Sequence, residues 1–250
     1  MAERRRVALV TGGSRGLGAV IAGVLAGRGY DLVIGGRDRD ALNHVTHALS
    51  APLETRQPGP RSRVLAVAGD LTEPGTRTSY LDAARQLGGL DVLVNNASEL
   101  GPIGPLVNFD VTRLGRLFPV NAAVPLWLTQ LAAPMLSERQ GLVVNITSDA
   151  AVAAYPGWGP YAASKAALEL ISRTLAAELA EQGIAVVLVD PGDMRTRMHQ
   201  EAFAGEDISD RPLPEVTVPF WQWLFDREPA TLAGQRVRAQ QENAPWLQLA

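Results

Sequence analysis

Cysteine is absent from this chain, and histidine and lysine are scarce. Without cysteine there can be no disulfide, no thiolate nucleophile and no cysteine-ligated metal. Of the three histidines, His44 and His47 lie close together, but no acidic cluster at metal-binding spacing accompanies them. We therefore interpret them as part of an exposed helix face, and no metal site is expected. Lys165 is the only lysine among 23 basic residues.

The chain also lacks a long hydrophobic run and an excess of positive charge. The arginines at residues 4–6 resemble the start of a signal peptide, but the apolar run at residues 7–10 is too short for one. No segment approaches the length of a transmembrane helix. A formal net charge of −3 argues against nucleic acid or an anionic membrane as a general partner. We expect a cytoplasmic protein that acts on a small molecule.

What the sequence does contain is a regular alternation of short apolar runs and longer helical patterns. The runs are rich in Val, Ile and Leu without polar alternation, as in strands buried on both faces, and cover residues 7–10, 32–34, 64–68, 92–94, 142–146 and 185–189. Helical patterns lie between them, at about residues 17–28, 39–50, 73–87, 110–138 and 160–182. This order predicts an α/β fold with a Rossmann-type doubly wound parallel sheet and helices on both faces. Since the 250 residues contain no internal repeat or low-complexity linker, we expect a single domain over residues 1–250.

Two segments depart from this alternation. Residues 50–63, with several prolines, are typical of an extended surface loop between the second helix and the third strand. Residues 193–219 follow the sixth strand and mix large apolar side chains with three prolines. A long irregular segment after the carboxyl end of a strand is a candidate lid over a substrate site.

A glycine-rich loop joins the first strand to the first helix. Its sequence, Thr-Gly-Gly-Ser-Arg-Gly-Leu-Gly at residues 11–18, places Gly12 for a tight turn, Gly16 for close approach to a pyrophosphate and Gly18 for helix packing. The glycine spacing alone is weak evidence, and a turn that binds nothing is the alternative; the strand before it and the helix after it favour a dinucleotide site. The loop residues predicted to contact the cofactor are Gly12, Ser14, Arg15, Gly16, Leu17 and Gly18.

The end of the second strand favours NADP(H). A carboxylate at this point holds the ribose hydroxyls of NAD. Here Gly36 cannot do so, whereas Arg37 and Arg15 could both reach a 2′-phosphate as forked donors. Asp38 lies at the spacing expected of an NAD-type acid, about 20 residues after the last glycine, and keeps NAD as an alternative.

A second motif, Tyr161-Ala-Ala-Ser-Lys165, places a phenol and an ammonium on one face of a helix. A free tyrosine titrates near 10, and an adjacent cation could lower that pKa by about three units, which takes roughly 4 kcal/mol. The only lysine thus stands where a compact point charge is needed. A surface Tyr–Lys pair without function is the alternative.

Together these residues resemble the short-chain dehydrogenase/reductases, in their short branch of about 250 residues. The resemblance covers nearly the whole chain and weakens after about residue 195. The spacings from Asn121 to Ser148 and from Ser148 to Tyr161 match the family. The motifs that carry it are the loop at residues 11–18, Asp70, Asn95-Asn96-Ala97, Asn121, Ser148, Tyr161, Lys165 and Pro191-Gly192.

The resemblance implies a role for each catalytic residue. Tyr161 would be the general acid in reduction and the base in oxidation, and Ser148 would donate a second hydrogen bond to the substrate oxygen. Lys165 would lower the pKa of Tyr161 and hold the nicotinamide ribose, while Asn121 would organise a proton-relaying water. Asn95 would brace the sheet. The further cofactor contacts implied are Arg37, Asp70, Leu71, Asn95, Ala97, Tyr161, Lys165, Pro191, Gly192 and Thr196.

One departure from the family pattern is Ser98, which stands where the family usually has glycine, so the loop must tolerate a side chain or shift. Other side chains are placed to line a substrate cleft, with ordinary packing as the alternative for the aromatic ones: Glu99, Leu100, Asp149, Tyr155, Trp158, Met194, Met198 and Phe203. For Trp221 and Trp223 we favour core packing or a subunit contact over a ligand site.

These observations predict an NADP(H)-dependent carbonyl reductase that interconverts a ketone and a secondary alcohol. An NAD-dependent alcohol dehydrogenase uses the same residues and is the enzymatic alternative. A non-catalytic NADP(H)-binding sensor is the alternative from another class, although it would not need the complete Tyr, Lys, Ser and Asn set. The apolar faces of the helices at 110–138 and 160–182 suggest a homodimer or homotetramer.

Overall fold

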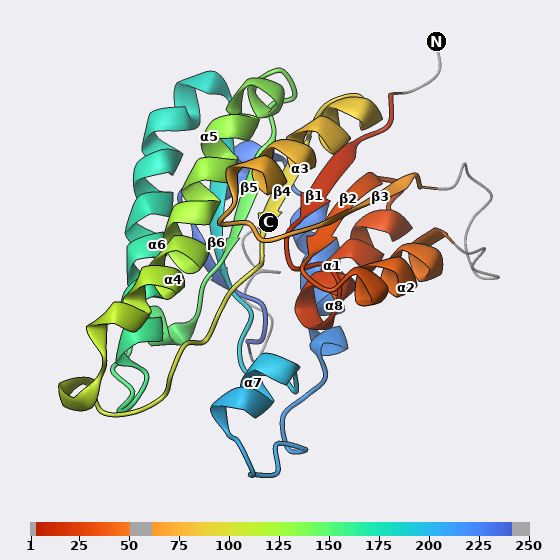
Figure 1. Ribbon diagram of the computed structural model, residues 1–250. Coiled ribbons are helices and arrows are strands. Elements are labelled where there is room, and N and C mark those ends of the chain that lie inside the picture. Colours follow the sequence, from red (N-terminus) through yellow and green to blue (C-terminus); the bar gives the residue numbers. More distant parts are fainter. Residues whose placement is uncertain (1–3, 51–61, 242–250) are drawn as a thin grey trace.

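The computed structural model describes residues 4–50 and 62–241, and this part of the chain is built on one parallel sheet. The sheet has seven strands in the order β3-β2-β1-β4-β5-β6-β7 (Figure 1). The strands are β1 (Val7–Val10), β2 (Asp31–Gly36), β3 (Val64–Ala68), β4 (Val92–Asn95), β5 (Leu142–Ile146), β6 (Ala185–Asp190) and β7 (Arg236–Arg238). The strand order reverses direction between β1 and β4, which confirms the doubly wound Rossmann-type architecture.

Helices cover both faces of the sheet. On one face lie α1 (Gly16–Gly27), α2 (Arg39–Ser50) and α8 (Val218–Phe225). On the other lie α3 (Pro74–Leu87), α5 (Val124–Ser137) and α6 (Gly159–Leu179), with the short α4 (Leu114–Phe118) against α6. Helix α7 (Arg197–Ala202) stands apart, beyond the carboxyl ends of the strands at the bottom of Figure 1.

The strand residues explain why the sheet needs two helical layers. Successive side chains of a strand point to opposite faces. In β1, Ala8 and Val10 enter one apolar cluster, while Val7 and Leu9 enter the other. All four are completely buried, so the uninterrupted apolar runs of the sequence correspond to strands covered on both faces.

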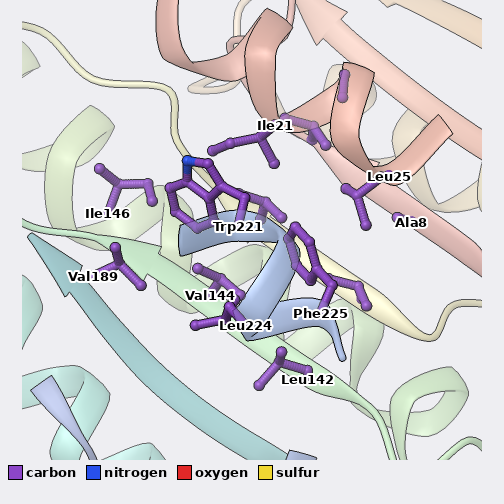
Figure 2. Packing of buried hydrophobic residues seen from close by; sticks show 14 of the residues in the cluster. Ala8, Ile21, Leu25, Leu142, Val144, Ile146, Val189, Trp221, Leu224 and Phe225 are labelled. Carbon is purple, nitrogen blue, oxygen red and sulfur yellow. The ribbon is translucent and has the colours of Figure 1, made fainter. Parts of the chain in front are cut away.

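Helix α8 closes the first of these clusters. Figure 2 shows Trp221 and Phe225 packed among Ile21 and Leu25 of α1 and the β5 side chains around Val144. The indole Nε1 of Trp221 donates to the hydroxyl of Thr217 at 2.9 Å, so its one polar group is satisfied inside the core. The interpretation of Trp221 and Trp223 as core residues is confirmed, since their side chains are 0% and 8% exposed.

Several boundaries differ from the sequence prediction. The helix predicted over 110–138 is divided into a 3-10 turn, α4, a π-helical turn (Pro119–Ala123) and α5, because Pro119 and Pro125 supply no backbone N–H to a continuous helix. Strand β7 was not predicted, since a three-residue edge strand with two arginines has no apolar run. Most of the loop predicted at 50–63 lies outside the described residues. Within the described residues, no helix has the length and apolar character needed to cross a membrane.

Candidate active site

A cleft of about 1510 Å³ opens at the carboxyl ends of the strands. Its walls come from the loops that follow β1 to β6, and it lies where the strand order reverses, the usual ligand position in open α/β sheets. All the residues predicted for the catalytic and cofactor sites line this cleft except Asn95 and Asn121, which are buried behind its wall. All eight residues predicted for the substrate side line it as well.

The loop after β1 has the backbone geometry that the sequence suggests. Gly12 has a φ of +64°, which favours glycine, and a Cβ on Gly18 would lie 2.3 Å from the Gly12 carbonyl oxygen. Helix α1 begins at Gly16 with no side-chain hydrogen bond at its N-cap residue, Arg15. The first N–H groups of α1 therefore remain for an anion in the cleft.

The loops after β1 and β4 are joined by hydrogen bonds. The Thr11 hydroxyl oxygen accepts from the backbone N–H groups of Asn96 and Ala97, at 2.9 and 3.0 Å. The Asn96 side chain donates to the Thr11 carbonyl at 2.9 Å. The motif at 95–97 thus fixes the glycine loop against the neighbouring strand, a role that the sequence could not specify.

The end of the cleft beside β2 and β3 carries paired charges. Arg15 contacts Asp38 at 2.6 Å, and Arg37 contacts Glu99 at 2.7 Å. Asp38 also accepts from the backbone N–H of Ala41 at 3.0 Å, near the start of α2, and this hydrogen bond is the main reason that its pKa lies below the usual value. Both arginines predicted to bind a phosphate are therefore held by carboxylates of the chain itself.

Arg116 of α4 extends this set of ion pairs and was not identified from the sequence. It contacts Asp70 at 2.7 Å and Glu99 at 3.0 Å. Although partial burial opposes the shift, hydrogen bonds from Thr72 and Arg116 lower the pKa of Asp70 to about 2. Arg116 carries no motif, so only the folded chain brings it to this site.

At the other end of the cleft, Tyr161 and Lys165 project from α6. The Lys165 Nζ donates to the Ile146 carbonyl at 2.9 Å and lies 5.8 Å from the centre of the Tyr161 ring. Burial lowers the pKa of Lys165 to about 8. Burial also raises the pKa of Tyr161 to about 12, against a smaller opposite effect of hydrogen bonds with Ser148 and Ser98.

The expected lowering of the Tyr161 pKa is therefore wrong for the chain without a bound dinucleotide. The phenolate would lose its hydration in a site that is almost closed to water, and a lysine that is itself buried does not compensate for that loss. The consequence is chemically useful, because Tyr161 stays protonated at neutral pH and can act as an acid.

Ser148 lies two residues after β5, and its hydroxyl has two hydrogen-bond partners besides Tyr161. The oxygen accepts from the Ala150 backbone N–H at 3.2 Å, and the hydroxyl donates to Oδ1 of Asp149 at 3.0 Å. The second carboxylate oxygen of Asp149 accepts from the Tyr155 hydroxyl at 2.6 Å. Asp149 and Tyr155 thus form a polar wall beside the serine predicted to bind the substrate oxygen.

The side chain of Asn121 is fully engaged with the protein. In the middle of the π-helical turn, its Oδ1 accepts from the Ser98 hydroxyl at 3.0 Å and from the Glu99 N–H at 2.8 Å. Its amide donates to the Glu99 carbonyl and to the hydroxyl of Ser164 on α6. The loop tolerates Ser98 by this bond to Asn121. Since the Asn121 amide has no free donor, the water-organising role implied by the family would fall to its backbone.

Asn95 has the bracing position implied by the family but does not line the cleft. Its amide donates to Asn145 of β5 at 2.8 Å, and Asn145 donates in turn to Ser172 of α6 at 2.7 Å. This buried series of hydrogen bonds ties β4 and β5 to α6. Asn95, predicted as a cofactor contact, is thus separated from the cleft, whereas its neighbours Asn96 and Ala97 line it.

A buried ionic cluster behind Ser148 was missed by the sequence analysis. Glu169 of α6 accepts from the Thr147 hydroxyl at 2.9 Å and from Arg236 of β7 at 2.8 Å. Arg236 also donates to the Ser148 carbonyl at 3.1 Å and contacts Asp190 at 3.3 Å. The cluster fixes the backbone of Ser148 to β6, β7 and the catalytic helix, and only the spatial neighbourhood of β7 reveals it.

The predicted lid lies along the open side of the cleft. Met194, Met198 and Phe203 line the cleft, and Figure 1 shows α7 beyond the carboxyl ends of the strands. Trp158 meets the Tyr161 ring edge-on with centroids 5.9 Å apart, and meets the Phe203 ring at 6.1 Å. The substrate end is thus walled mainly by aromatic and thioether groups, with Asp149 and Tyr155 as its polar side.

Comparison with known proteins identifies the family of this chain. The family of short chain dehydrogenases matches residues 6–207. The L-xylo-3-hexulose reductase of Hypocrea jecorina is 35% identical over 221 residues, which is 79% of this chain and 69% of that protein. The chloroplastic NADPH-dependent aldehyde reductase-like protein of Arabidopsis thaliana is 34% identical over 199 residues, which is 77% of this chain and 74% of that protein. A short chain dehydrogenase from Shigella flexneri, solved in complex with NADP, has a TM-score of 0.83 and 27% identity, with 94% of this chain and 97% of that chain covered.

Proposed function

This chain belongs to the short-chain dehydrogenase family, and from that premise we propose that it is an NADPH-dependent reductase that converts a ketone into a secondary alcohol. The single observation that carries the proposal is the meeting of Tyr161, Ser148 and Lys165 at one end of a cleft whose other end is a glycine loop. Such a cleft can hold a dinucleotide along its length and a carbonyl group beside Tyr161.

The residues present fit a dinucleotide. A Cβ on Gly18 has no room beside Gly12, and the start of α1 offers free N–H groups to a pyrophosphate. Asp70 and Leu71 would border the adenine, and Lys165 and Thr196 the nicotinamide half. The bound NADPH supplies the hydride that adds to the carbonyl carbon.

Tyr161 would supply the proton that the reduction requires. Its hydroxyl donates a proton to the carbonyl oxygen as that oxygen gains negative charge, and Ser148 stabilises the same oxygen by a hydrogen bond. Because burial raises the pKa of Tyr161 to about 12, the proton that the reduction requires is present at neutral pH. Lys165 stands beside the ring as the nearest amine from which the proton on Tyr161 can be restored.

The preference for NADPH rests on the end of β2. Gly36 offers no carboxylate there, and Asp38 is already engaged with Arg15 and the first turn of α2. Arg37 and Arg15 would exchange their carboxylate partners for a 2′-phosphate, a charge-assisted contact of the same kind. The names of the Arabidopsis relative and of the Shigella complex agree with this preference.

We also propose that the described segments form one domain that assembles as a homodimer or homotetramer. Leu131 on α5 and Leu170 on α6 are 44% and 64% exposed, on helices whose other faces cover the sheet. Exposed apolar side chains on two such helices suit a self-complementary interface. Light scattering at several protein concentrations measures the mass of the assembly. A monomer at every concentration would contradict the proposed oligomer.

The function is tested by following NADPH oxidation with a panel of ketones. We expect turnover with NADPH in preference to NADH, and loss of turnover in Tyr161→Phe with nearly unchanged NADPH binding by fluorescence titration. Retained turnover in Tyr161→Phe would contradict the mechanism. Higher kcat/KM with NADH than with NADPH, together with oxidation of alcohols by NAD⁺, would favour the dehydrogenase alternative. Cofactor binding without any turnover would favour the sensor.

A further inference from the structure

The proton of the Ser148 hydroxyl is already committed to Asp149. Ser148 donates to Asp149 Oδ1 at 3.0 Å, and its oxygen accepts from the Ala150 N–H at 3.2 Å. A serine hydroxyl has only one proton to donate. To stabilise a substrate oxygen, Ser148 must turn that proton away from Asp149.

Asp149 would then lose one of the hydrogen-bond donors of its carboxylate. Oδ2 keeps the hydroxyl of Tyr155 at 2.6 Å and the backbone N–H of Ala150 also contributes, but Ser148 is the one side chain of the described residues that donates to Oδ1. Although partial burial opposes the shift, the hydrogen bonds from Tyr155, Ser148 and the Ala150 backbone hold the pKa of Asp149 below its usual range, so the group is ionised. An ionised carboxylate that loses a donor beside a bound substrate is destabilised unless the donor is replaced.

A substrate can supply the missing donor if it carries a hydroxyl next to its carbonyl group. The carbonyl oxygen would accept from Ser148, and the neighbouring hydroxyl would donate to Asp149 Oδ1. A carboxylate in the same place would be repelled by Asp149, which argues against 2-keto acids. An alkyl group would not replace the donor that Ser148 withdraws from Oδ1.

On the proposed reductase function, we propose that the substrates are α-hydroxyketones and that Asp149, oriented by Tyr155, is the residue that selects them. The selected group is a hydroxyl on the carbon next to the carbonyl, recognised as a hydrogen-bond donor. Ser148 and Tyr161 keep their roles on the carbonyl oxygen, and hydride and proton are added as in the reduction of any ketone.

The test compares three ketones that differ only in the group next to the carbonyl. Hydroxyacetone carries a donor, 2-butanone an alkyl group of similar size, and methoxyacetone an ether that withdraws electrons but cannot donate. A second set (2-hydroxyacetophenone, propiophenone and 2-methoxyacetophenone) serves if the aromatic wall around Trp158 requires a larger ketone. The kcat/KM values with NADPH are measured for the natural chain, for Asp149→Ala and Asp149→Asn, and for the control Glu201→Gln.

We expect the natural chain to prefer the hydroxyketone to the methoxyketone by about tenfold or more, the value of one discriminating hydrogen bond to a charged group. Asp149→Ala should abolish that preference while it keeps or raises kcat/KM for the alkyl ketone, because Ser148 is freed. Such opposite changes with two substrates would not follow from a loss of structure. Glu201 lines the same cleft but pairs with Arg197, so Glu201→Gln should keep the preference.

Two other outcomes overturn the inference and are distinguishable from each other. Equal preference for hydroxyketone and methoxyketone, unchanged in Asp149→Ala and Asp149→Asn, rejects the role of Asp149 but leaves the reductase function in place. Absence of turnover with all six ketones rejects the proposed function and the inference with it.

Discussion

The two ends of the cleft hold their polar groups in different ways. At the catalytic end, Lys165 and Asn121 are buried and hydrogen-bonded to backbone or to buried side chains. At the end beside β2, Arg15 and Arg37 are 42% and 63% exposed and are paired with carboxylates that a phosphate would have to replace. On the proposed function, the groups that act on the carbonyl are preorganised, whereas the choice of cofactor would depend on exchangeable ion pairs.

The largest effect expected is at the catalytic end. Lys165→Met removes the only amine near Tyr161, and kcat for ketone reduction should fall roughly 10³-fold, within the range of general acid–base contributions. The dissociation constant for NADPH, measured by fluorescence titration, should change far less. Lys165→Arg keeps the charge without the compact ammonium, and should also be impaired. An equal loss in kcat and in NADPH affinity would show that the two ends are not separable.

The cluster behind Ser148 gives the next effect. Arg236→Met removes the arginine shared by the buried carboxylates of Glu169 and Asp190, which keep only the more exposed Arg173 and Arg238, so the free energy of unfolding should fall by about 2 kcal/mol. The loss of its bond to the Ser148 carbonyl should also lower kcat by about tenfold.

Urea denaturation and steady-state kinetics measure the two changes separately. Adding Glu169→Gln to Arg236→Met removes one of the two buried carboxylates that have lost a cation and should recover part of the stability. A destabilised Arg236→Met with unchanged kcat would mean that Arg236 supports the fold but does not position Ser148.

A third prediction concerns pH. Burial lowers the pKa of Lys165 from 10.5 to about 8, so between these values the unfolded chain binds more protons than the folded chain. The free energy of unfolding without dinucleotide should therefore rise with pH, by at most about 2 kcal/mol from pH 8 to about pH 9.5, below the range where tyrosine titrates. Urea denaturation at each pH measures this rise. Lys165→Met should not show it, and the same rise in both chains would contradict the assignment.

The smallest effect is expected at the exposed end. Arg37→Ala should lower kcat/KM for NADPH by about tenfold and leave kcat/KM for NADH nearly unchanged, because only NADPH carries the 2′-phosphate. Arg39→Ala, which removes a neighbouring exposed arginine outside the cleft, is the matched control. A loss with both cofactors would indicate that Arg37 supports the adenosine end through Glu99 instead.

The sequence predicts the parts of the molecule that follow from local pattern. The apolar runs gave six strands because a strand covered on both faces needs a continuous apolar stretch. The glycine loop and the Tyr161–Lys165 pair were found because each needs a fixed residue type at a fixed spacing. The family resemblance added Ser148 and Asn121 to the predicted site, although neither residue stands in a recognisable local pattern.

The features that the sequence did not predict depend on which residues the fold brings together. Arg116 and Arg236 act through partners far away in the chain, and β7 has no apolar run by which to find it. The pKa of Tyr161 was predicted in the wrong direction, since the sequence shows the cation beside it but not the burial of both groups. The engagement of Ser148 by Asp149 was equally invisible, although the two residues are adjacent.

The solitary lysine also makes this chain open to a simple proteolytic assay. A lysine-specific endopeptidase has one place to cut, near the second turn of α6, where Lys165 is only 2% exposed in the folded state. Cleavage can proceed only when this helix opens, so its rate reports the opening free energy of that helix. Slower digestion on addition of a nucleotide or ketone would then reveal binding without any turnover.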